Sequence, residues 1–352
     1  MPDMSSTRTS YDLVVLSGDI GGTNANFALI GKKGGTFTLL FDRHYRTRAE
    51  PTLVSALEKF VLEAARECPG IAPELCCISA AGPVIGRRIE LTNAPWSIDG
   101  AEVESHFGFR TLLINDFTAI SYGVLLLDPR DPEELLRLPH TDGSLPDPKP
   151  GVRVVIGAGT GLGYGYVVKI HDRTEAFASE GGHVTLPVYD EVSRALQSWL
   201  AERMDFVPGA EAAVSGIGIS NIHEFFYSRM GCREGLNAEI LRMDGGARPA
   251  LISANAEADP VCAATMDMFV RLYARVAADA AATFLPSGGV FLAGGIAAKN
   301  EARFLEGQRF METFEKSYRG HIRSILCATP VMIVKDYAIS LYGAANAAVM
   351  NC

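Results

Sequence analysis

Short apolar runs recur along the whole chain, and longer stretches with apolar residues three and four positions apart separate them. The runs are typical of buried β-strands, and the second spacing indicates amphipathic helices. The clearest helical pattern follows Pro51, where Leu53, Leu57 and Phe60 share one face before the break at 68–70. Short strands that alternate with helices predict an α/β fold in both halves of the chain.

The same patterns set the expected boundaries of the other elements. Strands are expected at 13–16, 25–30, 36–41, 75–80, 111–114, 152–156, 164–170, 175–178, 290–292 and 331–334. Further helices are expected at 118–127, 191–203, 263–284 and 337–350. The stretch 139–151 is rich in Pro and Gly and indicates a surface connection. The polar segment 228–259 yields no predicted structure.

Two glycine-rich turns interrupt this pattern, one in each half. The first, residues 19–24, reads Asp-Ile-Gly-Gly-Thr-Asn, and the second, residues 157–163, reads Gly-Ala-Gly-Thr-Gly-Leu-Gly. Apolar runs flank both, which indicates strand, tight turn and strand. Glycine lets backbone N–H groups turn toward an anion, and a Thr hydroxyl adds a donor. One such turn is equally well an ordinary hairpin, but two in matching contexts suggest a duplicated domain that grips a polyphosphate from both sides.

Length and charge limit the possible partners. A chain of 352 residues, 48% hydrophobic, is long enough for two domains with large cores. We expect a small α/β domain at 12–116, with helix 337–350 packing back on it, and a large one at 117–336. The net charge of −9 argues against a nucleic-acid or anionic-membrane partner. An acidic protein that binds a nucleotide generally needs a cation to neutralise the phosphates.

Cysteine usage and hydropathy indicate a cytoplasmic protein. The seven Cys form no CxxC pair, and Cys76 and Cys77 are adjacent on an expected buried strand, which suits reduced thiols. No apolar run approaches the length of a membrane helix. Residues 1–10 are polar and lack the hydrophobic stretch of a signal peptide.

Seven segments together resemble the bacterial glucokinase family, in the sugar kinase, actin and heat-shock ATPase superfamily. They are LSGDIGGTNANFAL, LTNAPWSI, LLINDFTAISYG, VVIGAGTGLGYG, SEGGHVTLP, VSGIGISN and FLAGGIAAKN. The resemblance implies two ribonuclease-H-like (actin-like ATPase) domains around a central cleft, with sugar between them and ATP with Mg²⁺ mainly on the larger one. It also implies a homodimer. Segment 184–192 has no Cys, so the chain resembles zinc-free glucokinases rather than the repressor/open-reading-frame/kinase group, which carries a zinc motif there.

Asp116 is the candidate general base. It follows an expected strand, at the carboxyl end where α/β sheets place ligands, and a sugar hydroxyl that attacks phosphorus needs a group to take its proton. On local sequence alone, Asp116 is as readily the N-cap of the helix expected at 118–127. The resemblance favours the catalytic role on the 6-hydroxyl of the sugar.

The resemblance also implies a set of sugar-binding residues. Asn115 would bond sugar hydroxyls beside the base, and Glu180 and His183 would accept from and donate to others. A carboxylate that accepts from vicinal hydroxyls suits a polyol. A lone His is more often a satisfied core residue, but the two glycines between Glu180 and His183 allow close backbone approach. Glu211 is a second acceptor or a solvated loop carboxylate, and Asn93 lines the cleft or serves a structural turn.

For the nucleotide, the resemblance places Asp19 on Mg²⁺, through water, because Mg²⁺ loses its hydration shell reluctantly. The expected phosphate- and adenosine-binding residues are Gly21, Gly22, Thr23, Asn24, Gly159, Thr160, Gly161, Gly294 and Gly295. Neither glycine-rich turn contains Lys or Arg, so N–H groups and metal must meet the phosphate charge. The Gly-Lys-Ser/Thr string of a P-loop is absent.

These features together predict a glucokinase that makes glucose 6-phosphate from glucose and ATP. A kinase for another hexose, such as mannose or N-acetylglucosamine, is the alternative within the same class. A sugar-sensing regulator on the same scaffold would carry a helix-turn-helix before the first turn, where only 18 residues precede Asp19. An actin-like ATPase would need neither Asn115 and Asp116 nor Glu180 and His183.

Overall fold

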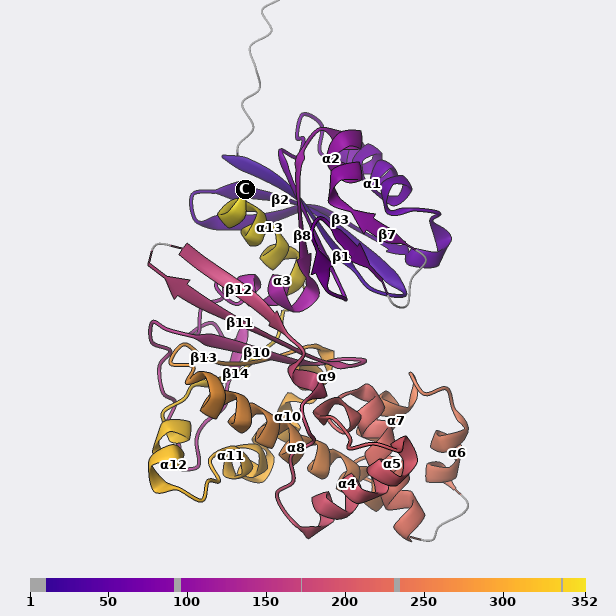
Figure 1. Ribbon diagram of the computed structural model, residues 1–352, viewed down its shortest axis with the longest axis vertical. Helices are drawn as coiled ribbons and strands as arrows, with labels where there is room; N and C mark the ends of the chain where they lie inside the picture. Colours follow the sequence, from indigo (N-terminus) through magenta and orange to yellow (C-terminus); the bar gives the residue numbers. More distant parts are fainter. Residues whose placement is uncertain (1–10, 92–95, 172, 231–234, 337) are drawn as a thin grey trace, which may run out of the picture. The chain divides into compact units, whose positions relative to one another are not determined.

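The computed structural model describes residues 11–91, 96–171, 173–230, 235–336 and 338–352 (Figure 1). Its contacts divide the chain into two compact units, the first formed by residues 1–126 and 338–352 and the second by residues 127–337. Each unit has its own hydrophobic core and its own main sheet.

The sheet of the first unit has five strands in the order β3-β2-β1-β4-β8. The strands are β1 (Leu13–Ile20), β2 (Asn24–Lys33), β3 (Thr36–Arg46), β4 (Leu75–Ala80) and β8 (Arg110–Asn115). The first three form an antiparallel meander, and β4 and β8 continue the sheet parallel to β1. The meander and the strands expected from the apolar runs are confirmed.

The sheet of the second unit repeats this plan in the order β12-β11-β10-β13-β14, with β9 added at the edge. The strands are β10 (Arg153–Ala158), β11 (Leu162–Ile170), β12 (Arg173–Ser179), β13 (Gly289–Ala293), β14 (Val331–Val334) and β9 (Leu135–Arg137). Again three strands are antiparallel and two follow in parallel. The chain is therefore a duplicated mixed α/β fold.

Helix α1 (Leu53–Glu67) covers the sheet of the first unit with the apolar face that the sequence predicts. It begins after Thr52, whose hydroxyl accepts from the N–H of Ser55 as an N-cap. Short elements complete this unit: η1 (Thr47–Ala49), β5 (Val84–Ile85), β6 (Arg88–Glu90), β7 (Ser97–Asp99) and α2 (Gly100–Phe107). Strands β5, β6 and β7 form a small separate sheet that the sequence did not predict.

The C-terminal helix α13 (Ile339–Asn351) belongs to the first unit, where it packs against β1, β4 and helix α3 (Asp116–Gly123). The crossing of α3 and α13 is close, since a Cβ on Gly343 would lie 1.9 Å from the carbonyl oxygen of Ala119. Asn346 also donates to the carbonyl of Tyr122 (3.0 Å). The two compact units divide after Leu126, whereas the sequence places the boundary after Asp116.

The second unit is built around α8 (Pro260–Phe284), which is buried along most of its length. Tyr273 of this helix donates to the carbonyl of Ile156 in β10 (2.8 Å), which anchors α8 to the sheet. No structure was predicted for segment 228–259, which contains the end of α5 (Gly216–Met230) and two short helices. The remaining helices are α4 (Glu191–Met204), α5 (Gly216–Met230), α6 (Leu236–Arg242), α7 (Arg248–Ala254), α9 (Gly295–Lys299), α10 (Glu301–Leu305), α11 (Arg309–Phe314) and α12 (Gly320–Cys327), and the 3₁₀ turns are η2 (Gly181–His183), η3 (Ala210–Ala212) and η4 (Glu306–Gln308).

Within the part of the chain that the structure describes, no helix combines the length and apolar character needed to cross a membrane.

Candidate active site

The carboxyl ends of the parallel strands in the first unit gather two carboxylates. Asp19 in β1 pairs in register with Ser79 in β4, and Ala80 of β4 pairs with Asn115 at the end of β8. Asp116 follows directly as the first residue of α3. Both acids therefore lie at the same edge of the sheet, where α/β folds bind ligands.

Asp116 is a partly buried acid with raised basicity. The pKa of its carboxyl is raised to about 6, mainly by burial and also by the nearby Asp19 carboxylate, although the N–H of Phe117 donates to Oδ1 at 3.0 Å and opposes the shift. Asn115, and not Asp116, caps α3, since its Oδ1 accepts from the N–H groups of Phe117 (2.9 Å) and Thr118 (3.4 Å). The N-cap alternative for Asp116 is therefore wrong.

The side chain of Asn115 is engaged on both sides. Its oxygen caps α3, and its Nδ2 donates to the carbonyl of Gly82 (3.3 Å). The amide thus ties the end of β8 to the segment after β4, which fixes the backbone on which Asp116 stands. A sugar hydroxyl would have to share these bonds.

Asp19 is held by a residue from the far end of the chain. Ser340 in α13 donates its hydroxyl to Oδ2 of Asp19 at 2.9 Å. Burial raises the pKa of Asp19, and the hydroxyls of Ser340 and Ser79 oppose that shift. Helix α13 therefore positions both acids, Asp19 through Ser340 and Asp116 through its packing on α3.

The charge of this pair fits a hard divalent cation. Among the residues that the structure describes, no Lys, Arg or His forms an ion pair with Asp19 or Asp116. Burial raises the pKa of both carboxyls, and the Asp19 carboxylate adds to the shift of Asp116, so a nearby positive charge would stabilise their ionised forms. Carboxylate oxygens are the ligands that Mg²⁺ prefers, so Asp19 is chemically suited to hold it, directly or through water.

The turn after β1 presents free backbone donors. Thr47 ties down its carbonyls, because its Oγ1 donates to Gly21 (3.1 Å) and its N–H donates to Thr23 (3.0 Å). The N–H of Gly21 closes the turn on the carbonyl of Asn24 (2.8 Å). Within the described residues, the N–H groups of Gly22 and Thr23 have no such acceptor, so they remain available to an anion.

The equivalent turn after β10 is braced from outside its hairpin. Oε2 of Glu211, in η3, accepts from the N–H of Leu162 (2.8 Å), and a Cβ on Gly161 would lie 2.4 Å from that oxygen. The N–H of Gly216, at the start of α5, donates to the carbonyl of Gly159 (2.8 Å). One carboxylate oxygen of Glu211, which was expected to bind sugar, is thus used to hydrogen-bond the turn. In the described chain, the N–H groups of Thr160 and Gly161 have no protein acceptor.

The Gly181-Gly182 pair lies directly on strand β11, as the close approach expected of it requires. A Cβ on Gly182 would lie 2.0 Å from the carbonyl oxygen of Leu162, and one on Gly181 would lie 2.6 Å from the ring of Tyr164. The flanking side chains are exposed, with Glu180 Oε2 and His183 Nε2 3.6 Å apart. His183 is therefore no core histidine, and both groups are free to meet a ligand.

Two further contacts join these loops within the second unit. The N–H of Ala210 donates to the carbonyl of Val184 (2.8 Å), which sets η3 beside the loop that carries His183. Gly294, with φ +88°, follows β13, and a Cβ there would lie 2.6 Å from the carbonyl oxygen of Ala158. Gly294 therefore lies against the end of β10, just before the turn at Gly159.

The predicted residues thus fall into two groups, one in each unit. Asp19, residues 21–24, Asn115 and Asp116 come together in the first, and residues 159–161, Glu180, His183, Glu211 and Gly294 come together in the second. Asn93 lies outside the described residues. Ser340 and Thr47 were missed, because a hydroxyl that supports a residue hundreds of positions away leaves no local pattern. The only signal was the expectation that the C-terminal helix packs back on the first domain.

Comparisons with known proteins identify the family of the chain. The sequence profile of the glucokinase family matches residues 16–351. Glucokinase from Nostoc punctiforme is 30% identical, covering 94% of this chain and 98% of its own, and glucokinase from Synechocystis is 33% identical, covering 96% and 98%.

Solved structures share the fold. The crystal structure of a glucokinase from an Antarctic psychrotroph superposes with a TM-score of 0.80 at 28% identity, covering 96% of this chain and 98% of its own. A Balamuthia mandrillaris glucokinase in complex with glucose gives 0.76 at 22% identity, covering 96% and 94%. The fold is the two-domain actin-like ATPase fold. The chain belongs to the glucokinase family and is a hexokinase-type phosphotransferase.

Proposed function

We propose that the chain transfers the terminal phosphoryl group of ATP to the 6-hydroxyl of glucose, with Asp116 as general base. The carboxylate takes the hydroxyl proton, the hydroxyl oxygen bonds to the γ-phosphorus, and the bond from that phosphorus to the bridging oxygen breaks to release ADP. The observation that carries the proposal is an acid of raised pKa at the end of a parallel strand, with no described cationic partner. A base is most effective when its pKa lies near the working pH.

Mg²⁺ belongs to the proposal through Asp19. When bound, the ion would offset the charge of the ATP phosphates. Asp19 would hold it, and Ser340 keeps Oδ2 of that carboxylate in place. Positive charge beside Asp19 would also favour the deprotonated form of Asp116, which is the form that accepts a proton.

The remaining residues receive binding roles. Free N–H groups at Gly22, Thr23, Thr160 and Gly161 would donate to phosphate oxygens, while the glycines at 294–295 leave room for adenosine. The exposed Glu180 and His183 would accept from and donate to sugar hydroxyls. Support comes from the Balamuthia mandrillaris enzyme, described with glucose, and a Streptomyces griseus glucokinase, described with glucose and AMPPNP. Asn115, Glu211 and Asn93 stay proposed sugar contacts, the first two alongside their structural bonds.

A coupled assay of the purified protein with MgATP and a panel of hexoses tests this function. We expect ATP consumption to depend on sugar and to be most efficient with glucose, followed by mannose and N-acetylglucosamine. Highest kcat/KM with another hexose would reassign the substrate within the same class. ADP release that is independent of sugar would indicate an ATPase, and glucose binding without turnover would indicate a regulator.

Cellular context and assembly complete the proposal. We place the protein in the cytoplasm, where its product, glucose 6-phosphate, enters glycolysis. All six cysteines among the described residues are free thiols, which suits a reducing compartment. A homodimer is proposed from the family resemblance, and light scattering during size-exclusion chromatography should give twice the chain mass of 37.8 kDa.

A further inference from the structure

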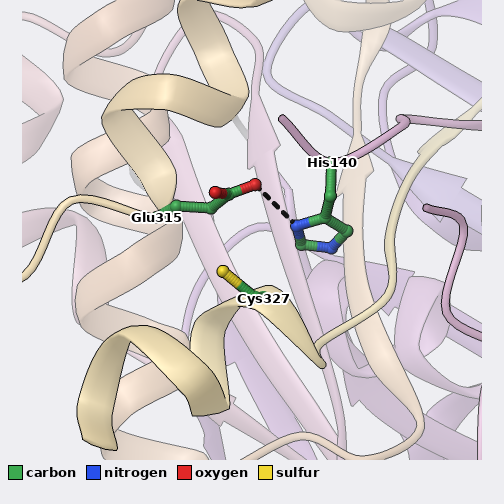
Figure 2. Close-up of side chains that lie close together, drawn as sticks. All are labelled: His140, Glu315 and Cys327. Carbon is green, nitrogen blue, oxygen red and sulfur yellow. Dashed lines mark hydrogen bonds and ion pairs between the residues drawn. The ribbon is translucent and has the colours of Figure 1, made fainter. Parts of the chain in front are cut away.

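Three side chains that could ligate a metal meet in the second unit, at residues that the proposed reaction does not use. His140 follows β9, Glu315 follows α11 and Cys327 ends α12. One ligand atom from each lies within 4.8 Å of the others (Figure 2). His140 and Glu315 are buried, and Cys327 is partly exposed. We propose that these three residues form a zinc-binding site.

The ligand types and spacing suit zinc. Zn²⁺ binds imidazole nitrogen, thiolate sulfur and carboxylate oxygen at about 2.0–2.3 Å, and sites with three protein ligands leave the fourth position to water. Nδ1 of His140 lies 2.9 Å from Oε1 of Glu315, so that pair is already closer than two ligands of one ion need to be. Shifts of about 1 Å in these side chains would admit the ion at zinc–ligand lengths.

Second contacts orient the ligands as metal sites require. Nε2 of His140 lies 3.0 Å from the carbonyl oxygen of Thr329, which can only accept, so Nε2 donates and Nδ1 faces the cluster. The N–H of Thr141 donates to Oε1 of Glu315 (2.8 Å), and its hydroxyl donates to Oε2 (2.6 Å). Ligating imidazoles and carboxylates are typically held by such outer bonds.

Charge and access are also compatible with zinc. A carboxylate, a thiolate and a neutral imidazole around Zn²⁺ sum to zero, which suits a buried place. The only cation near Glu315 in the described chain is Arg323, with Nη2 3.6 Å from Oε2; its side chain is 58% exposed and can turn to solvent. A hollow of about 420 Å³ has Cys327 and Arg323 in its wall and offers a path for the ion and its water ligand.

The metal-free contacts show what zinc would replace. The His140–Glu315 hydrogen bond occupies the place of one metal–ligand pair, and the thiol of Cys327 lies within 4.8 Å of both of these ligand atoms. Zinc would displace the proton of the His140–Glu315 bond and the thiol proton of Cys327, and it would join the connection after β9 to the ends of α11 and α12. These residues differ from segment 184–192, which carries no Cys, so this is not the zinc motif of the related kinase group.

The test uses full-length, untagged protein stripped with a chelator and then given ZnSO₄ alone. After desalting, elemental analysis should find one zinc per chain, and competition with a chromophoric chelator gives the affinity. Cys327→Ser should weaken binding by more than the roughly 10–100-fold that loss of an outer-shell partner costs, and Thr141→Val by about that amount. Cys68→Ser, a partly exposed cysteine in the other unit, is the matched control and should bind as wild type.

Cobalt substitution identifies the ligand. Co²⁺ should give a thiolate charge-transfer band in wild type, in Cys68→Ser and in Thr141→Val, and no such band in Cys327→Ser. Circular dichroism and glucose-dependent turnover verify that each variant is folded. Should Cys327→Ser fail to fold, peptide mapping of wild type replaces it: zinc must protect Cys327, but not Cys68, from iodoacetamide. Absence of retained zinc, equal zinc in Cys327→Ser, or no protection of Cys327 would overturn the proposal.

Discussion

The hairpins β1–β2 and β10–β11 occupy equivalent places in the two sheets, but different chemistry surrounds them. The penultimate residue of β1 is Asp19, which pairs in register with Ser79 of β4. At the same position of β10 stands Gly157, paired with Ala293 of β13. One sheet edge therefore carries a carboxylate held by a hydroxyl, while the other exposes bare backbone.

The difference shows how two copies of one backbone plan can have different roles, one holding a cation and the other binding only an anion. In the first unit the acid belongs to the strand itself, and α13 supplies its support through Ser340. In the second unit the acid, Glu211, comes from a separate 3₁₀ turn, and one of its oxygens accepts from the N–H of Leu162. The shared strand order thus provides two turns suited to bind anions. Only the turn after β1 has a strand carboxylate, Asp19, beside it that could also bind a cation.

Removing each acid in turn should separate these roles most strongly. We expect Asp19→Asn to lower kcat by roughly 10²-fold or more, because a metal that neutralises transferring phosphate supplies several kcal/mol. Glu211→Gln keeps an oxygen for the N–H of Leu162 and should change KM for ATP only a few fold. Steady-state kinetics with varied MgATP measures both. Equal losses in the two variants would contradict the division of roles.

The raised pKa of Asp116 should make the free energy of unfolding depend on pH. Asp116 has a pKa near 3.9 when unfolded and about 6 when folded, so the folded state holds the proton longer. Stability without ligands should therefore fall as pH rises from about 4 to about 6, by at most about 3 kcal/mol from this group. Asp19 shifts in the same direction.

Urea unfolding of wild type and Asp116→Asn at several pH values measures this contribution. The variant lacks the titrating group, so its free energy of unfolding should fall less over the same window. Parallel curves for the two proteins would show that Asp116 titrates normally in the folded state.

The second turn can be tested with two neighbouring glycines. Gly161→Ala places a Cβ 2.4 Å from Oε2 of Glu211 and should push that carboxylate off the N–H of Leu162, at a cost of about 1 kcal/mol and several-fold in KM for ATP. Gly159→Ala meets no atom within 4 Å and is the matched control for space. The Gly161→Ala effect should shrink in a Glu211→Ala background. An undiminished effect there would place its cause elsewhere.

Ser340 should give the smallest effect. Ser340→Ala removes one hydrogen bond to Asp19 and should raise the Mg²⁺ concentration for half-maximal rate by a few fold, with little change in KM for glucose. Ser340→Thr keeps the hydroxyl and should restore the Mg²⁺ requirement. A structural defect alone would shift thermal stability and leave the Mg²⁺ titration unchanged.

Sequence patterns predicted best the helices and strands that are determined by their own residues rather than by contacts with distant segments. Segment 331–334 is a continuous apolar run, and segment 75–80 is apolar except for Ser79; both are strands with those boundaries. Helix α3 begins earlier than its apolar pattern suggests, because Asn115 caps it and Asp116 opens it. Helix α5 was missed, since Gly216 and Gly218 near its start weaken the helical signal and are explained only by tight packing on Gly159 and Ala213.

The same distinction between local patterns and distant contacts applies to the site residues. Asp19, Asp116 and the glycines of both turns could be singled out because each follows a strand and belongs to a motif of the family. The support of Asp19 by Ser340, the grip of Glu211 on Leu162 and the meeting of His140, Glu315 and Cys327 depend on folding over long sequence separations. No spacing rule records such contacts.

The substitution Asp116→Asn tests the central claim most directly. It keeps the size and most hydrogen bonds of the side chain but cannot accept the proton of the 6-hydroxyl. We predict that glucose binding remains measurable by calorimetry while kcat falls about 10²–10⁴-fold, the usual contribution of a positioned base. A variant that binds glucose and turns over at close to the wild-type rate would contradict the assignment of Asp116 as the base.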